Sequence, residues 1–210
     1  MSADLYEVLE KRRTYRDFSG REVSDEILRR VTGAAFKAPT NDYLRQFELV
    51  VGRGRENIAR TIAPLARNME KFKTLVAEAD ESGDRDKMAM FADALPKQQK
   101  MLMESGLLII PFFRQLTWPL LKPAEQSSLN YFASAWCAVE NMLLAATAEG
   151  LGAVFHIPVS DEADRIKAIV HAPEDYEMAC LLTIGYPAEN AFLPKQKAID
   201  TETRIHRNIW

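Results

Sequence analysis

Apolar side chains recur every three or four residues in several stretches of the chain, a spacing that predicts amphipathic helices. The first helix begins near Ser2, a good N-cap, and ends at a cluster of arginines. A second helix begins after Ser24 and carries an apolar stripe of Ile27, Val31, Ala34 and Ala35. Longer helices are predicted for residues 57–79, with a kink at Pro64, and for residues 129–149, which Gly150 ends. Another helix follows the cap Ser160–Glu162.

Short continuous apolar runs predict buried strands at Phe47–Val51, Leu107–Phe112 and Met178–Ile184. Strands that alternate with long helices indicate an α/β or α+β sheet flanked by helices. Because the helices outnumber the strands, a regular doubly wound sheet is disfavoured. We expect one domain over residues 1–210, with residues 80–128 forming a helical and loop excursion that includes a helix or mobile lid over Asp80–Lys100.

The tail of the chain, residues 190–210, has no core pattern of its own. It nevertheless holds Phe192, Leu193, Ile205, Ile209 and Trp210. Apolar side chains at this density need a surface to cover them. We therefore expect the tail to pack on a partner subunit.

Composition restricts the class of protein. The 210 residues are 47% hydrophobic and 27% charged, as in soluble globular proteins, and a net charge of −3 disfavours a nucleic-acid or membrane-surface function. No signal peptide is visible, and the longest apolar run, Leu107–Phe113, is too short to span a bilayer. Cys137 and Cys180 stand alone in apolar surroundings, which favours buried free thiols. A cytoplasmic protein is expected.

Several common kinds of site find no support. The pairs at Gly52–Gly54 and Gly150–Gly152 lack the third glycine of a dinucleotide-binding loop and are typical of caps and turns. The three histidines, His156, His171 and His206, are scattered without metal-ligand spacing, so no metal site is expected. No Gly-x-Ser-x-Gly turn is present, and neither cysteine lies next to a base.

The cluster Arg12, Arg13, Thr14 and Arg16 has two interpretations. Arginine is a planar, permanently charged fork that suits phosphate, which favours an anion site. Cations that follow a helix also interact favourably with the negative C-terminal end of its dipole, which favours a merely structural role. The residues of the cluster alone leave both open.

Four segments, in order along nearly the whole chain, resemble the nitroreductase family of flavoproteins. The N-terminal motif, Lys11–Phe18, is similar to the family pattern R-R-S-x-R-x-F. The other segments are Ala38–Asn41 with Phe47–Val51, Glu140–Ala146 with Glu149–Ala153, and Ile184–Pro187 with Leu193–Lys197. The resemblance implies an α+β nitroreductase-like fold, with a central mixed or antiparallel sheet flanked by helices, in an interlocked homodimer that binds FMN.

The resemblance also implies a role for individual residues. Arg12, Lys195 and Lys197 would hold the FMN phosphate, Thr14 would donate a hydrogen bond to the phosphate or ribityl chain, and Arg16 would lie beside the pyrimidine edge of the flavin. Asn41 would reach the cofactor across the dimer interface. The stretch Phe155, His156 and Ile157 would face the ring with its backbone, although His156 is equally a satisfied polar residue. Arg13 belongs to the motif, but its pattern is also that of a surface charge.

The activity that follows from the resemblance is an FMN-dependent oxidoreductase, with ping-pong hydride transfer from NAD(P)H to a small conjugated acceptor such as a nitroaromatic or quinone. No acid or base side chain is required, because the flavin carries the chemistry. Two alternatives remain open. One is a protein that stores or senses flavin, and the other is a flavoenzyme independent of NAD(P)H, such as a reductive dehalogenase or a dehydrogenase.

Overall fold

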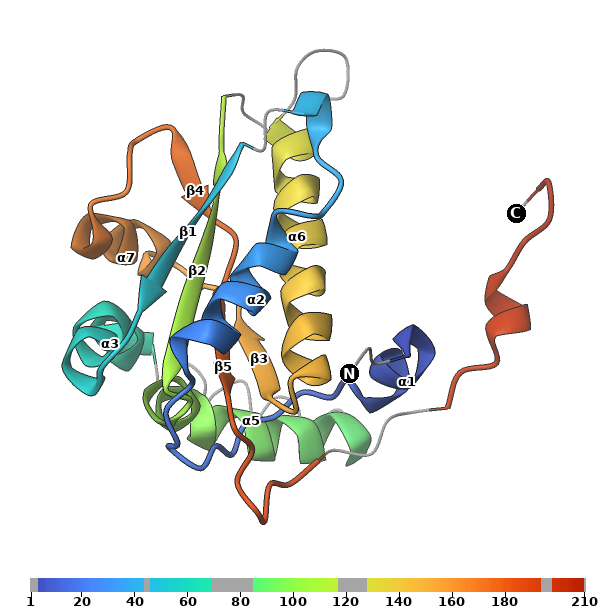
Figure 1. Cartoon of the computed structure of the whole chain (residues 1–210), viewed down its shortest axis with the longest axis horizontal. Coiled ribbons are helices and arrows are strands. Elements are labelled where there is room, and N and C mark those ends of the chain that lie inside the picture. The colour runs from blue at the N-terminus through green and yellow to red at the C-terminus, as the bar shows by residue number, and fades with distance from the viewer. Residues whose placement is uncertain (1–3, 44–45, 69–84, 117–127, 194–197, 210) are drawn as a thin grey trace.

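An antiparallel sheet separates two layers of helices (Figure 1). The computed structural model describes residues 4–43, 46–68, 85–116, 128–193 and 198–209. Within these ranges the strands are β1 (Phe47–Gly52), β2 (Leu107–Arg114), β3 (Gly152–His156), β4 (Tyr176–Met178) and β5 (Leu181–Gly185). Their order is β1-β2-β5-β3, with β4 paired to β2, and every ladder is antiparallel. The expected α+β architecture with a central antiparallel sheet is confirmed.

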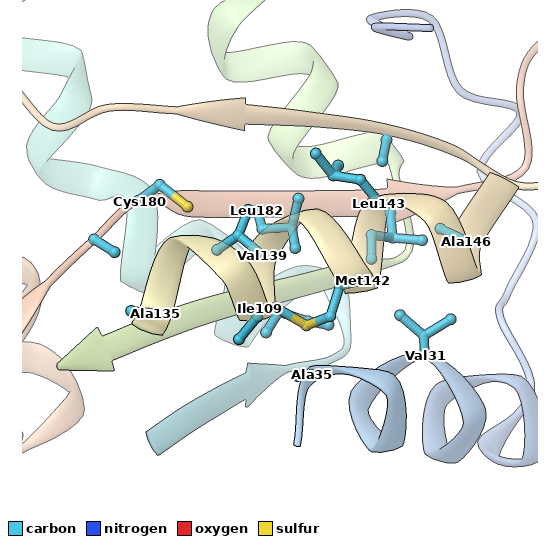
Figure 2. Close-up of a cluster of buried hydrophobic side chains, with 14 of the residues drawn as sticks. Val31, Ala35, Ile109, Ala135, Val139, Met142, Leu143, Ala146, Cys180 and Leu182 are labelled. Atoms are coloured by element: carbon cyan, nitrogen blue, oxygen red, sulfur yellow. The ribbon is translucent and has the colours of Figure 1, made fainter. Parts of the chain in front are cut away.

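One face of the sheet is covered by α2 (Asp25–Ala35) and α6 (Ser128–Ala148). Small side chains on α6 let it approach both α2 and the sheet closely, and Figure 2 shows Met142 and Val139 of α6 between these layers. The apolar stripe predicted for α2 is buried at Val31 and Ala35. This face forms the larger of the two cores.

The other face is covered by α3 (Arg55–Ile62), the 3₁₀ helix η2 (Ala63–Asn68), α5 (Arg85–Glu104) and α7 (Glu162–Val170). Ile58, Leu102 and Ile166 from these helices pack on Ile110 of β2. Two short elements, α1 (Leu5–Lys11) and η1 (Asn41–Tyr43), complete the body of the fold, and η3 (Thr201–Arg204) lies in the tail. Figure 1 shows the tail beyond residue 197 running away from the sheet and its helices.

Helix boundaries follow their capping side chains. Ser24 Oγ accepts from the backbone N–H of Ile27, which confirms the predicted start of α2. The prediction that Ser2 caps the first helix is wrong, because the helix begins after Asp4, whose carboxylate accepts from two backbone N–H groups. The predicted helix over residues 57–79 is α3 only up to Ile62; a 3₁₀ helix containing Pro64 follows, and residues 69–84 lie outside the described residues.

The excursion predicted over Asp80–Lys100 is helical from Arg85 and continues as α5 to Glu104. Residues 117–127, near the end of the excursion predicted over residues 80–128, lie outside the described residues. Gly150 has a φ of +72° and follows α6, as expected of a helix-ending glycine.

Two strand predictions need correction. The strand at Phe47–Val51 is not fully buried, because β1 lies at the edge of the described sheet, where it pairs with β2 alone and leaves Val51 38% exposed. The run Met178–Ile184 is not one strand but two. Ile109 of β2 pairs with Leu182 of β5, and Phe112 of β2 pairs with Met178 of β4. The two partners are therefore three residues apart along β2 but four residues apart along the β4–β5 segment.

The extra residue lies opposite Pro111, which has no N–H to donate to a ladder. Ala179 N instead donates to the Pro111 carbonyl oxygen at 2.9 Å. The sequence signal for this bulge was therefore the proline on the partner strand, not the apolar run itself.

The two cysteines differ in environment. Cys180 is fully buried, and burial raises the pKa of its thiol to about 12. Cys137 is exposed in this chain, so the prediction that it is buried is wrong. It lies on the outward face of α6, four residues after the exposed Ala133.

Candidate cofactor site

The N-terminal motif lies along the free edge of β3. Its first residue after α1, Arg12, has an extended backbone that ends the helix and directs the chain toward the sheet. Thr14 then forms a parallel bridge with Ala153, and Tyr15 N donates to the Ala153 carbonyl oxygen at 3.1 Å. The Tyr15 ring lies directly over Gly152, where an added Cβ would be 2.6 Å from Tyr15 Cγ. Only glycine at 152 allows this close approach.

The side chains of the motif fall into two groups. The Arg13 guanidinium folds back and donates to the carbonyl oxygens of Glu10 and Arg12. Within the part of the chain that the structure describes, the Arg12 guanidinium and the Thr14 hydroxyl have no hydrogen-bond partner. A cation and a hydroxyl that have no partner and lie close together on one extended segment form the donor set expected for an anion.

The open edge of β3 adds backbone donors next to this segment. In an antiparallel strand the N–H and C=O of one residue point to the same side, and the side alternates along the strand. Since the Ala153 carbonyl points away from β5, toward Tyr15, the N–H group of Phe155 points to the same open edge, and Ile157 follows the end of the strand. Among the described residues the motif pairs with β3 at Ala153, so the Phe155 N–H lies beyond the pairing.

An aromatic surface lies beside these donors. The Phe155 ring is 42% exposed and packs edge to face on Trp136 of α6, with ring centroids 5.3 Å apart. Ile157 is 47% exposed. A flat apolar surface next to backbone donors suits a planar heteroaromatic ring.

His156 points to the opposite face of the sheet. Its Nε2 lies 2.9 Å from Glu162 Oε2, its Nδ1 contacts the Gln98 amide, and the side chain is 4% exposed. Glu162 is fully buried and also accepts from Val159 N at 2.9 Å. Of the two interpretations of His156, its ring fits the satisfied polar residue, and the alternation along β3 turns its backbone toward β5 rather than toward the open edge.

The tail returns to the motif before it leaves the body of the protein. Phe18 forms a bridge with Pro187, Ala188 N donates to the Asp17 carbonyl oxygen at 3.0 Å, and Phe192 N donates to Asp17 Oδ2 at 3.3 Å. Lys195 and Lys197 lie outside the described residues. Phe192, which contacts the motif through Asp17, lies only three positions before Lys195 in the sequence.

Asn41 does not join this group in one subunit. Its backbone N–H donates to Ser134 Oγ near the start of α6, whereas Thr14 pairs with Ala153 just beyond the end of that helix. At about 1.5 Å per residue, the part of α6 between Ser134 and Ala148 separates them by roughly 20 Å.

Sequence reasoning missed four residues that support the site: Asp17, Lys97, Gln98 and Glu162. Lys97 and Gln98 meet the motif and β3 only through the tertiary fold, so no local signal identifies them. The local pattern placed Glu162 in a helix cap, but it is the first residue of α7, whose N-cap Asp161 makes no side-chain cap hydrogen bond, and its carboxylate accepts from Val159 N, which precedes the helix. Its burial against His156 has no signature in the local sequence.

Metal and membrane features are not found in the described ranges. No group of three His, Cys, Asp or Glu side chains there could hold a metal ion. None of the helices described is long and apolar enough to cross a membrane.

A sheet between two helical layers, with a cationic segment docked on the sheet's free edge, defines an α+β protein that binds an anionic, planar ligand. The Nitroreductase family model matches residues 9–186. The chain belongs to the nitroreductase family.

Individual relatives agree with this assignment. A "Putative NADH dehydrogenase/NAD(P)H nitroreductase" of Methanothermobacter thermautotrophicus is 28% identical over 99% of this chain and 88% of its own length. The iodotyrosine deiodinase of Haliscomenobacter hydrossis is 26% identical over 92% of this chain and 83% of its own. A crystal structure of oxidized iodotyrosine deiodinase bound to FMN and 3-iodo-L-tyrosine matches the fold with a TM-score of 0.71 at 22% identity, covering 99% of this chain and all of the other.

Proposed function

We propose that this chain is an FMN-dependent oxidoreductase that takes hydride from NAD(P)H and passes it to a small conjugated acceptor. The observation that carries the proposal is the pairing of Thr14 with Ala153, because it places the cations of the motif beside the open edge and aromatic surface of β3. Family membership and the FMN bound in a structural relative support the choice of cofactor.

The residues fit the two ends of FMN. Arg12 and Thr14 offer a charge and a hydroxyl to the phosphate, and Lys195 and Lys197 follow the tail segment that meets the motif at Phe192. Arg16 follows Thr14 by two residues and contributes a cation nearer the flavin ring. Positive charge there favours a reduced, anionic flavin. When bound, FMN supplies the electron storage that lets donor and acceptor react in succession.

The ring end is served by the edge of β3. The outward N–H group of Phe155 is the donor that the strand offers to flavin N5, and Ile157 follows just past the end of the strand, whereas the backbone of His156 faces β5. The aromatic surface of Phe155, packed on Trp136, would cover one side of a bound ring. Hydride transfer needs donor and acceptor atoms held about 3–3.5 Å apart, and a fixed strand edge can hold the ring for this.

A homodimer is part of the proposal. The described tail residues 198–209 are all exposed, including Ile199 at 67%, Ile205 at 56% and Ile209 at 80%. Because isolated chains rarely leave so much apolar surface in water, a second copy is the expected cover. The partner's α6 end would then bring its own Asn41 to the cofactor, which explains why Asn41 lies far from the motif within one subunit.

A second candidate is reductive dehalogenation without NAD(P)H. Relatives named iodotyrosine deiodinase, such as that of Haliscomenobacter hydrossis, favour it. Both functions use the same cofactor site and differ in the electron donor and acceptor. A protein that only stores or senses FMN is the remaining alternative.

Anaerobic mixing separates these functions. The purified yellow protein is mixed with NADH or NADPH without oxygen, and flavin absorbance near 450 nm is followed on the order of seconds. Rapid bleaching, followed by recovery when a nitroaromatic or quinone is added, supports the proposed reductase. A flavin that dithionite bleaches but neither nicotinamide bleaches contradicts the NAD(P)H step, and recovery on adding a halotyrosine would then support the dehalogenase.

A further inference from the structure

Asp17 is an acidic side chain inside the otherwise basic N-terminal motif. Its Oδ2 accepts from Lys97 Nζ of α5 at 2.5 Å and from the backbone N–H of Phe192 at 3.3 Å. The Asp17 side chain is 19% exposed and that of Lys97 is 25% exposed. One carboxylate therefore connects the motif, α5 and the tail segment that leads to Lys195.

The carboxylate is ionised at neutral pH. Burial on its own would raise the pKa of Asp17, but the hydrogen bonds from Lys97 and Phe192 and the positive charge of Lys97 together hold the pKa below its usual value. The pair is partly buried, so its charges are less screened than charges in open water. Without Lys97, a negative charge would lie one residue from Arg16, beside the segment proposed to hold a phosphate.

The fold holds Lys97 firmly in this position. The next turn of α5 is anchored in the core by Met101 and Leu102, which are 3% and 0% exposed. The adjacent Gln98 contacts the imidazole of His156 behind β3. Two consecutive residues of one helix thus contact the motif and the edge strand, and the turn that follows them is buried in the core.

We propose that Lys97 is a positioning residue of the cofactor's phosphate end, which neutralises Asp17 so that the motif can bind a dianion while the Asp17 carboxylate still joins the motif to α5 and to Phe192. This inference rests on the proposed function, because it concerns the same FMN site. Lys97 acts through Asp17 and not on the phosphate itself. Removal of the Asp17 carboxylate should therefore restore the FMN affinity lost with Lys97, which a direct contact between Lys97 and the phosphate does not predict.

The test is FMN titration of the full-length apoprotein, followed by quenching of flavin fluorescence. In the variant Lys97→Met the uncompensated carboxylate should weaken FMN binding about tenfold, the size of one lost charged hydrogen bond. In Asp17→Asn the repulsion is absent, and binding should stay within about twofold of the unaltered chain. The double variant should likewise recover to within about twofold, because removing the carboxylate removes the need for the ammonium.

A matched control lies on the far side of the fold. Lys167 of α7 pairs with Glu177 at 2.6 Å, with 14% and 29% of the side chains exposed, and neither residue is near the motif. Lys167→Met removes a comparable ion pair and should leave FMN affinity unchanged, even where it lowers the melting temperature. If Lys97→Met does not fold, Lys97→Gln replaces it, since it also removes the charge and is expected to act in the same direction.

The outcomes are distinct. Unchanged FMN affinity in Lys97→Met overturns the inference. A double variant as weak as Lys97→Met also overturns it, because Lys97 would then contact the phosphate directly. If the unaltered chain binds no FMN, both the proposed function and the inference fail. If the unaltered chain binds FMN normally, but Lys97→Met binds it equally well or the double variant stays as weak as Lys97→Met, only the role of Lys97 is overturned.

Discussion

Neighbouring residues of β3 have opposite tasks. Phe155 presents an exposed ring and an outward N–H on the side of the motif, while His156 turns its ring into the protein, toward Glu162. The two roles follow from the alternation of side chains along a strand. The edge that faces the ligand is therefore supported from behind by a buried polar pair rather than by apolar packing alone.

Removal of this support should destabilise the fold. In His156→Ala the fully buried Glu162 carboxylate loses its contact with the imidazole, and removing the partner of a buried charge costs about 3 kcal/mol. The urea midpoint at fixed protein concentration measures the loss. His171→Asn is the control: His171 is exposed with a φ of 54°, which asparagine tolerates, so its midpoint should not move. Equal midpoints for both variants would show that the His156–Glu162 pair contributes nothing to stability.

Side chains with local causes could be predicted, and those with tertiary causes could not. Ser24 as a cap and Gly150 as a helix end follow from local backbone chemistry, and the structure has both. Local spacing carries no information on the pairing of Asp17 with Lys97, 80 positions apart. The same holds for the environment of Cys137, since its exposure depends on which face of α6 the sheet covers.

At the scale of elements, the site depends on how closely the motif docks on β3. Tyr15 lies over Gly152, and its backbone N–H holds the Ala153 carbonyl. A Cβ at 152 would be 2.6–2.9 Å from three Tyr15 atoms, including its Cβ, which does not swing away as a chain end can. The motif would have to move as a whole.

The variant Gly152→Ala should therefore weaken FMN binding by about tenfold or more, since a displaced Tyr15 carries Thr14 and Arg16 with it. Fluorescence titration of the apoprotein measures this. Gly33→Ala is the matched control, because Gly33 lies within α2 with open space at its Cβ, where alanine favours the helix by about 0.5–1 kcal/mol. Normal FMN affinity in Gly152→Ala would show that the docking of Tyr15 does not position the cofactor.

Elements with a clear period were predicted well, and irregular ones were not. The repeat of three and four residues located α2 and α6, and the apolar run located β2, close to their observed bounds. The break between β4 and β5 was missed because a bulge is a relation between two strands, here imposed by Pro111 on the neighbouring strand. The path of the motif along β3 was missed for the same reason: it is a single bridge between distant segments.

At the scale of the whole molecule, the tail is the feature that one copy of the chain does not explain. Its isoleucines are exposed, and Figure 1 shows it extended away from the sheet. In the proposed homodimer, deletion of residues 198–210 should release single subunits and reduce bound FMN, because the contact proposed for the partner's Asn41 is lost with the interface. Light scattering and flavin absorbance measure the two effects.

The change Ile205→Asp with Ile209→Asp keeps the full length and should act like the deletion, since both side chains are more than half exposed and available to a partner. Glu202→Ala, an exposed change in the same segment, is the control and should leave the dimer intact. A full-length chain that scatters as a single subunit, or a deletion that stays dimeric, contradicts the role given to the tail.

The central claim is that the motif and the tail converge on the phosphate of FMN. The direct measurement is the FMN affinity of the double variant Arg12→Ala with Lys195→Ala, compared with Arg29→Ala with Lys37→Ala, which also removes two cations but from exposed positions outside the motif and the tail. We expect the first pair to lose FMN, with binding at least about a hundredfold weaker, and the second pair to retain it. FMN affinity unchanged in Arg12→Ala with Lys195→Ala would contradict the placement of the phosphate and with it the site.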